Sequence, residues 1–187
     1  MSSYLKLCYT FCKVGINVLI HDKALHVHSI VVSANDGITT TFAVVAGSLG
    51  ASLSPSIILI LGFANLFADG LSMATGSYLG VKSEIEFEED NGQNIKVGTE
   101  PIKNAITTFI SFIIAGFVPI LPYIFKMNNS FIISIILVFL ALNVVGIIRA
   151  KLTGKKIIRT AMENTLIGGS AAFVAYGVGY LVRRYLI

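Results

Sequence analysis

Charged residues are scarce in this chain, and the usual signs of a soluble domain are missing with them. Only 13% of the 187 residues are charged, whereas 55% are hydrophobic, and the mean hydropathy is +0.80. Soluble globular domains have roughly 25% charged residues. The composition therefore excludes an ordinary soluble domain and indicates an integral membrane protein with little chain left for an extramembrane domain.

Cysteine and histidine are also sparse. Cys8 and Cys12 are too few and too close together for a disulfide framework. All three histidines lie before the first long apolar run, and no Ser/His, Cys/His or HExxH arrangement exists, so we do not expect an enzyme. A metal site built from these residues and Asp22 would have no known ligand spacing, and we interpret residues 21–28 as a polar juxtamembrane linker.

The N-terminal segment, residues 1–28, has polar residues on one side of a predicted helix. Lys6, Thr10, Lys13 and Asn17 recur at intervals of four, three and four. This pattern predicts an amphipathic helix in the membrane interface; a signal peptide is disfavoured because lysines interrupt its apolar core and no cleavage site follows. After it we predict an all-α integral membrane domain over 29–187, with five transmembrane helices at about 30–52, 55–80, 103–125, 130–148 and 163–183.

Lysine and arginine are distributed unevenly between the two ends of these spans. Eleven of the 14 fall on the side of the N-terminus, the 82–102 loop and the 149–162 loop. By the positive-inside rule this side is cytoplasmic. The positive net charge thus reports topology, and we do not expect a nucleic-acid partner. In the third span Pro119 and Pro122 predict a kink in its outer half.

The short cytoplasmic loop at 82–102 holds six of the ten acidic residues. Carboxylates at the mouth of a path attract cations, but the same charge also suits a solvated connector that stays out of the lipid. We expect a short helical extension to carry the acids before a turn at DNGQN. The candidates for cytoplasmic metal capture are Glu84, Glu86, Glu88 and Glu89.

Polar residues inside the second span form a candidate ion path. Asn65, Asp69 and Met73 are spaced four and four and share one helix face, with Ser72 beside them. An acid in hydrocarbon costs roughly 2.5–3.5 kcal/mol on insertion scales and usually faces a protein interior or a water-filled path. Oxygen ligands suit hard cations and a thioether favours transition metals, so the set points to a first-row transition metal such as Fe²⁺ or Mn²⁺. A packing role for Met73 remains open.

The first span carries a second set. Asp36 is followed at three and four residues by Thr39 and Thr40, and Asn35 is adjacent. Intramembrane ionisable residues are functional by default, although a capping or interhelical hydrogen bond would also explain Asp36.

Small residues further along the first span predict a close helix contact. Ala43, Gly47 and Ala51 form a small-xxx-small ridge. If this ridge joins two copies of the first span, the resulting homodimer places two Asp36 carboxylates near one axis and builds a cation site by symmetry.

Two stretches carry a wider resemblance. Residues 35–47 read NDGITTTFAVVAG, and residues 68–79 read ADGLSMATGSYL and are followed by Lys82, Ser83 and Glu84. With further matches from Pro101 to Tyr123, the chain resembles the vacuolar iron transporter family over roughly residues 29–185. Members of that family move Fe²⁺, and often Mn²⁺, out of the cytosol in exchange for protons.

The resemblance implies a homodimer of five-span protomers whose ion path lies between the subunits and is lined by Asp36 and Met73. The chain departs from the plant-type members at two places. Asn65 stands where they have a glutamate, which removes one charge per subunit and puts proton coupling in question. Only the loop around Glu84 to Asp90 remains of their long acidic insert after the second span, so this is a short form.

We therefore expect a Fe²⁺ or Mn²⁺ transporter that uses proton antiport and has no prosthetic group. Asp36 from both subunits would bind the ion, Met73 would select it, and Asp69 with Asn65 would hydrate it or relay protons. A passive divalent-cation channel and a non-transporting membrane scaffold are the alternatives. The expected location is the cell membrane in a prokaryote and a vacuolar or other organelle membrane in a eukaryote, with a cytoplasmic N-terminus.

Overall fold

The computed structural model describes residues 2–90 and 100–186, with side chains from residue 26 onward, and this part of the chain is helical without any strand. Five segments in it are long and apolar enough to cross a membrane, which confirms the predicted all-α, five-span class. The helical elements are α1 (Ser2–Gly50), α2 (Pro55–Asp90), α3 (Pro101–Gly116), the 3₁₀ turn η1 (Val118–Ile120), α4 (Leu121–Ile124), α5 (Ser130–Thr153) and α6 (Ile157–Leu186).

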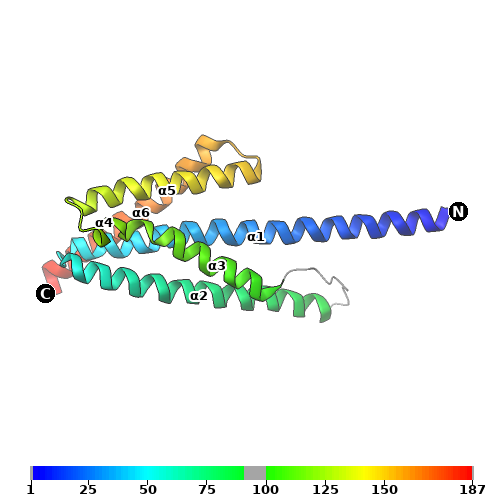
Figure 1. The fold of residues 1–187 in the computed structure, drawn as a ribbon, viewed down its shortest axis with the longest axis horizontal. Helices are drawn as coiled ribbons and strands as arrows, with labels where there is room; N and C mark the ends of the chain where they lie inside the picture. Colours follow the sequence, from blue (N-terminus) through cyan, green and yellow to red (C-terminus); the bar gives the residue numbers. More distant parts are fainter. Residues whose placement is uncertain (1, 91–99, 187) are drawn as a thin grey trace.

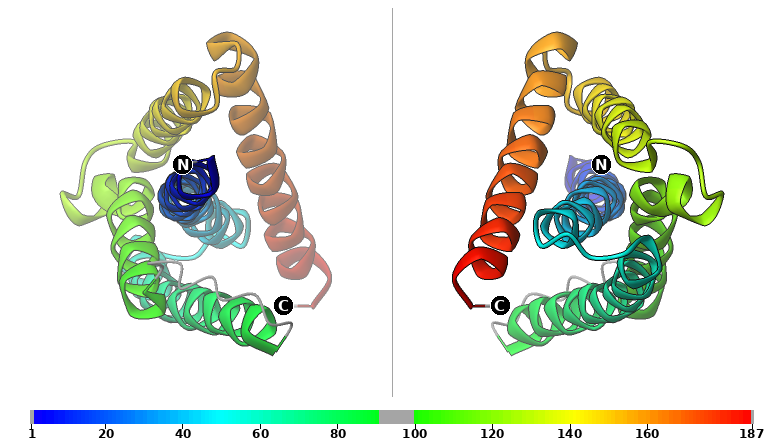
Figure 2. Two further views of the ribbon diagram at one scale, coloured as in Figure 1. Left: turned by 90° about the vertical axis from the view of Figure 1, so that its right-hand side faces the viewer. Right: turned by 90° about the vertical axis from the view of Figure 1, so that its left-hand side faces the viewer.

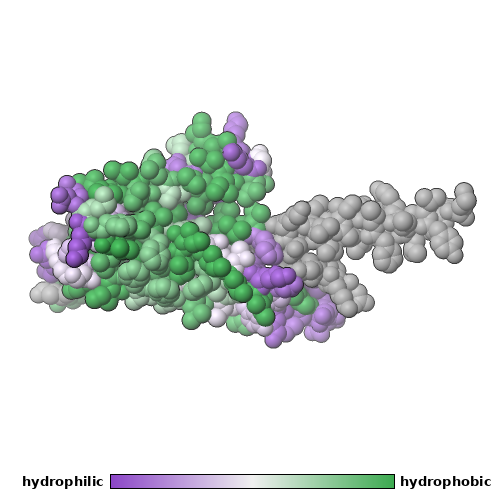
Figure 3. Space-filling model, in the orientation of Figure 1, coloured by the Kyte–Doolittle hydropathy of each residue, from purple (hydrophilic) through white to green (hydrophobic). Residues whose placement is uncertain are grey.

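Helix α1 is the central element of the bundle. It runs the length of the molecule in Figure 1, and the end-on views of Figure 2 show α2, α3, α5 and α6 arranged around it. Apolar side chains cover most of the visible side of the bundle, and hydrophilic residues gather toward its two ends (Figure 3). This distribution is that of a multi-pass membrane protein.

The N-terminal part of α1 differs from the sequence expectation. A separate interfacial helix and a linker at 21–28 were predicted, but a single helix continues from Ser2 to Gly50. No proline or glycine occurs between residues 16 and 36, so nothing in this stretch breaks the helix. A separate interfacial helix is therefore not confirmed, and the side chains predicted to form its polar stripe, like Cys8, Cys12 and His21, lie outside the described part.

Helices α1, α2 and α3 pack closely around two glycines. A Cβ added to Gly37 would lie 2.5 Å from the backbone oxygen of Phe112, so only glycine allows this approach of α1 to α3. Gly116 fills the corresponding position on α3, against Leu66 of α2 and the Gly37 carbonyl. The surrounding core is apolar and includes Ile38, Phe42, Val45, Ile58, Leu66, Phe112, Ile120, Tyr123, Val138 and Leu142.

The third span is broken where its prolines lie. Helix α3 ends at Gly116, and the chain continues through η1 and the short α4 rather than through one helix to residue 125. Pro119 and Pro122 lack the N–H groups that a continuous helix would need, which confirms the predicted kink. The Pro119 carbonyl accepts a hydrogen bond of 2.7 Å from Ser134 Oγ of α5, so a neighbouring helix satisfies it.

Two predicted connections are present at the ends of the bundle. Helix α2 continues to Asp90, which confirms the helical extension predicted for the acidic residues. Helix α5 ends at Thr153 and is followed by Gly154, whose φ of +66° is the left-handed conformation that favours glycine; α6 begins at Ile157.

Candidate ion path on α1 and α2

Asp36 lies on a face of α1 that the other helices cover only in part. Asp36, Thr40, Ala43 and Val44 on this face are all partly exposed, whereas Ile38 and Val45 elsewhere on α1 are buried. Thr40 Oγ1 donates a 2.9 Å hydrogen bond to the Asp36 backbone oxygen and leaves the carboxylate free of that hydroxyl. The one carboxylate of the first span is thus presented toward the outside of the protomer.

The α2 residues lie beside this face. Asp69 is close enough to Asp36 for the two charges to interact. Asn65 Nδ2 is buried and has no hydrogen-bond partner among the described residues. Met73 is partly buried and packs against the apolar core, which is the packing role that the sequence left open for it. Ser72 is exposed, and its backbone oxygen accepts a hydrogen bond from Thr75.

Not every predicted residue of the first span faces Asp69. Thr39 Oγ1 lies 3.3 Å from the position of a Cβ at Gly168, which places Thr39 against α6. Asn35 is one turn before Thr39 and shares its side of α1. Asn35 Oδ1 and Thr39 Oγ1 are buried without a hydrogen-bond partner in the described structure. The structure therefore separates Asn35 and Thr39 from the face that carries Asp36 and Thr40.

One member of the small-residue ridge on α1, Gly47, contacts α6 of the same chain. A Cβ at Gly47 would lie 3.2 Å from the Ala175 backbone oxygen, and Gly50 and Gly179 make similar backbone approaches between α1 and α6. The close contact expected from the small-xxx-small pattern is present, but within one protomer. The pattern does not identify the partner helix, because small residues specify a short interhelical distance without specifying which helix supplies the other side.

One chain does not bring many ligands together. No three His, Cys, Asp or Glu side chains gather in a metal-binding arrangement among the residues described. Asp36 and Asp69 supply two carboxylates at a partly open surface, with the Asn65 amide and the Met73 thioether on the same α2 face. Oxygen ligands of this kind hold divalent cations, and a hard cation needs more of them than one chain offers here.

The acidic residues of the α2 extension are largely solvent-accessible. Glu84, Glu86 and Glu89 are exposed and Glu88 is partly exposed, and Glu86 forms an exposed ion pair of 3.7 Å with Lys82. They line the end of α2 rather than a closed pocket, and residues 91–99 of the predicted loop lie outside the described part. This arrangement fits both the capture role and the solvated connector.

A buried hydrogen-bond network near Asp36 was not anticipated. Ser29 Oγ of α1 donates to Asn104 Oδ1 of α3 at 2.8 Å, and Asn104 Nδ2 donates to Ser77 Oγ of α2 at 2.8 Å. Thr108 Oγ1 adds a bond of 3.1 Å to the same Ser77 hydroxyl. The four-residue spacing of Asn104 and Thr108, which puts both on one face of α3, is the sequence signal that could have revealed it. The network joins the three helices that position Asp36 and Asp69.

The chain is similar in sequence to known proteins over most of its length. A model of the VIT family matches residues 27–97 and 90–180. The curated vacuolar iron transporter 1 of Eucalyptus grandis is 26% identical over 84% of this chain and 86% of its own length, and that of Oryza sativa subsp. japonica is 27% identical over 84% and 85%. The vacuolar iron transporter of Toxoplasma gondii is 25% identical over 84% of this chain and 74% of its own.

The alignment lengths also show whether this chain is shorter than its relatives. The alignments to the two plant proteins extend over 215 residues, more than the 187 of this chain, so the relatives contain residues that this chain lacks. The family match divides at residues 90–97, at the end of α2, where the sequence predicted a missing insert. With the family model matching most of residues 27–180 across all five spans, the chain belongs to the VIT family.

Proposed function

We propose that this chain transports Fe²⁺, Mn²⁺ or both out of the cytosol, by proton antiport through a path between two copies of the chain. The relatives are named vacuolar iron transporters, which supports a metal ion as the substrate. The chain is then a transporter and not an enzyme in the usual sense. The observation that carries the proposal is the Asp36 and Asp69 pair on a partly covered, membrane-embedded face.

A second copy would complete the coordination. One chain offers two carboxylates on this face, and a two-fold axis beside it would double the carboxylates and bring two Met73 thioethers near the same path. The partly covered positions Asp36, Thr40 and Ala43 provide the surface for this contact. The homodimer would thus use the Asp36–Ala43 part of this face, because Gly47, one turn further along the same face, is already in contact with α6.

Each residue has a role in this mechanism. Asp36 from both copies strips water from the cation and binds it, and Met73 favours transition metals over Mg²⁺ and Ca²⁺. Asp69 and Asn65 hydrate the ion or relay protons. Metal and proton then compete for Asp36, since a carboxylate that holds a proton has lost the charge that holds the metal. Glu84, Glu86, Glu88 and Glu89 would gather cations at the cytoplasmic end.

A passive channel is the second candidate, and Asn65 favours it. This amide cannot take up or release a proton as a carboxylate does, and its Nδ2 is buried without a partner among the described residues. If proton coupling depends on a titrating group at this position, Fe²⁺ would move down its own gradient only.

The proposed orientation follows from the basic residues. Most lysines and arginines lie on the side of the α1 N-terminus and the α5–α6 connection, which the positive-inside rule assigns to the cytoplasm. Export from the cytosol then delivers the metal to a vacuole or another organelle, or to the cell exterior if the chain lies in a cell membrane.

Flux in proteoliposomes tests the proposal. Fe²⁺ and Mn²⁺ should move under an imposed pH gradient, saturably and in preference to Ca²⁺ and Mg²⁺. Asp36→Asn should reduce this flux to the level of empty liposomes, because the substitution removes the charge and keeps the shape. Asp90→Asn, the same change at the exposed end of α2, is the matched control and should retain flux.

Each outcome has a defined meaning. Normal flux in a well-folded Asp36→Asn protein contradicts the mechanism. Metal flux that ignores the pH gradient supports the channel instead. A cysteine at Ala43, with Cys8 and Cys12 replaced by serine, should form a crosslinked dimer in the membrane; its absence, with flux intact, would reject the path between subunits.

A further inference from the structure

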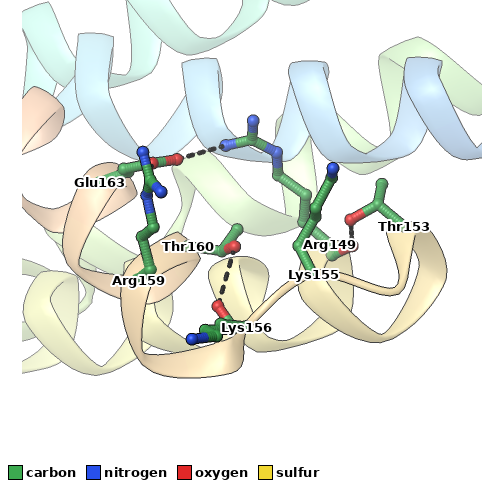
Figure 4. Close-up of a pocket in the computed structure, with 7 residues that line it drawn as sticks. All are labelled: Arg149, Thr153, Lys155, Lys156, Arg159, Thr160 and Glu163. Atoms are coloured by element: carbon green, nitrogen blue, oxygen red, sulfur yellow. Dashed lines mark hydrogen bonds and ion pairs between the residues drawn. The ribbon is translucent and has the colours of Figure 1, made fainter.

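The connection between α5 and α6 encloses a basic pocket outside the proposed ion path. The pocket has a volume of about 460 Å³. Figure 4 shows its side chains coming from the end of α5, the connection and the first turns of α6. Four are cations, two carry hydroxyls and one is a carboxylate: Arg149, Lys155, Lys156, Arg159, Thr153, Thr160 and Glu163.

The single carboxylate does not neutralise the pocket. Glu163 pairs with Arg159 at 3.2 Å and with Arg149 at 4.0 Å (Figure 4). Arg149 also donates a hydrogen bond of 3.2 Å to the buried Asn164 Oδ1, which fixes its position. Within the described structure neither Lys155 nor Lys156 has an ion pair. An arginine with two partners, a second arginine and two lysines without ion pairs favour a ligand with several anionic oxygens, such as a phosphate.

An apolar surface continues directly from the basic pocket. A wider hollow of about 1010 Å³ shares Lys155, Lys156, Arg159 and Glu163 with it and adds apolar side chains of α6. Ile158, Met162 and Leu166 recur every four residues, form one stripe on α6, and are 77%, 57% and 68% exposed. A free phosphate would not use this stripe, whereas an amphiphile would place its anionic group among the cations and its chain along the helix.

We propose that this pocket binds the phosphate headgroup of an anionic phospholipid, with an acyl chain along the Ile158–Met162–Leu166 stripe. The position suits such a ligand because the pocket lies at the adjoining ends of two helices that are long and apolar enough to span a membrane. Basic pockets between transmembrane helices on the cytoplasmic side are a recurring kind of anionic-lipid site. The lipid would hold the ends of α5 and α6 together. The inference does not depend on whether the chain transports metal.

Lipid binding to the purified full-length protein tests the proposal. The probes are dioctanoyl phosphatidylglycerol, dioctanoyl phosphatidylcholine and inorganic phosphate, measured by native mass spectrometry in detergent. The wild type should bind the glycerol lipid at least tenfold more tightly than the choline lipid. Each membrane-facing cation contributes about fivefold, so Lys155→Gln with Arg159→Gln should weaken binding of the anionic lipid roughly 25-fold.

A matched control removes two charges elsewhere. Lys151→Gln with Lys126→Gln takes away the same charge from exposed positions that do not line either cavity, and should leave binding within twofold of the wild type. If the double pocket variant does not elute as folded protein, Lys155→Gln alone should still show the fivefold loss. Equal loss in the pocket and control variants would mean that only net charge matters and would overturn the site.

A further variant separates a lipid from a free phosphate. Leu166→Ser should weaken binding of the anionic lipid and leave the affinity for inorganic phosphate unchanged. If inorganic phosphate binds as tightly as the lipid, and Leu166→Ser changes neither, the pocket holds a free anion and the lipid proposal is wrong. If phosphatidylcholine binds as well as phosphatidylglycerol, the basic residues do not select the headgroup and the proposal also fails.

Discussion

Two adjacent faces of α1 are built differently. On the face toward α3, Gly37 and Thr41 lie against Gly116 and the Phe112 backbone, and no space remains for a larger residue. On the next face, Asp36, Thr40 and Ala43 are partly exposed. The tightly packed face carries only small or apolar groups near α3, and the carboxylate lies on the face that the protomer leaves partly open. The contrast separates what holds one protomer together from what we propose to act on the ion.

The neighbouring helices place polar groups beside both faces. On the packed side Asn104 and Thr108 of α3 complete a buried hydrogen-bond network with Ser29 and Ser77. On the open side the buried Asn65 Nδ2 finds no partner in the described structure. Buried polar groups normally have partners, and exceptions call for an explanation. Unpartnered polar atoms occur on both sides, however, since Thr41 Oγ1 on the packed face also has no partner among the described residues. The network therefore distinguishes the packed side, and the carboxylate distinguishes the open one.

The largest expected effect comes from disturbing the packed face. Gly37→Ala places a methyl group 2.5 Å from a backbone oxygen of α3, which cannot rotate away as a side chain can. We expect a loss of stability near the upper end of the range of about 1–3 kcal/mol seen for overpacking, measured as a lower melting temperature in detergent. Gly169→Ala is the control, since nothing lies within 4 Å of its added Cβ. Equal melting temperatures for the two variants would contradict the tight approach of α1 to α3.

The buried network should give a smaller effect on the same side. Asn104→Leu removes the group that joins Ser29 to Ser77 and leaves both hydroxyls with fewer partners. We expect a loss of roughly 1–2 kcal/mol, within the range for stranded buried polar groups. The readout is thermal unfolding with flux measured at a temperature where the variant is folded. A loss of flux without a loss of stability would move Asn104 from the structural side to the path.

These faces were only partly predictable from the sequence. The kink at Pro119 and Pro122 was predictable because proline lacks a backbone donor whatever surrounds it. The helical extension to Asp90 followed from the position of the turn signal after it. Close packing by Gly47 was also predicted, but its partner helix was not, because spacing along one helix contains no information on its neighbour in space.

The candidate site shows the same limit. Asp36 and Asp69 were singled out because acids are costly in hydrocarbon, and Met73 because its soft thioether lies one turn from Asp69. The structure brings Asp36 and Asp69 within electrostatic reach. Thr39 and Thr40 were grouped because they follow Asp36 by three and four residues, yet the two are 100° apart on a helix and Thr39 lies against Gly168 of α6. Asn104 was missed because its significance depends on Ser29 and Ser77, which belong to other helices.

On the open face, Met73→Leu should change selectivity more than stability. Leucine keeps nearly the same volume against the apolar core, so the cost in stability should be below about 1.5 kcal/mol. Removing the thioether should lower the preference for Fe²⁺ over Mg²⁺ by about tenfold, the low end of the effect of losing one partner at a metal site. Met127→Leu, at an exposed position between α4 and α5, is the control. Unchanged selectivity would leave Met73 with packing alone.

The smallest effect is expected from the acidic extension of α2, where the charges are most accessible to solvent. We propose to replace four residues together with glutamine: Glu84, Glu86, Glu88 and Glu89. The apparent KM for Fe²⁺ should rise by about two- to threefold, because exposed charges attract cations only weakly. This effect is smaller than the rate gain that charges produce inside a cleft. The maximal rate should stay the same, since the ion path itself is intact. Proteoliposome flux at low and at high ionic strength measures both quantities.

Ionic strength provides the decisive comparison for this last variant. The difference in KM should be present at about 0.01 M salt, where the screening length is about 30 Å, and should shrink at about 0.15 M, where it is about 8 Å. Glu100→Gln is the matched control, because Glu100 lies near the same end of the bundle and is already paired with Lys103 at 2.6 Å. Equal KM values at low salt would reject cation capture and leave the extension as a solvated connector. A lower maximal rate with unchanged KM would instead mean that the extension acts on transport through the path itself, since α2 also carries Asp69.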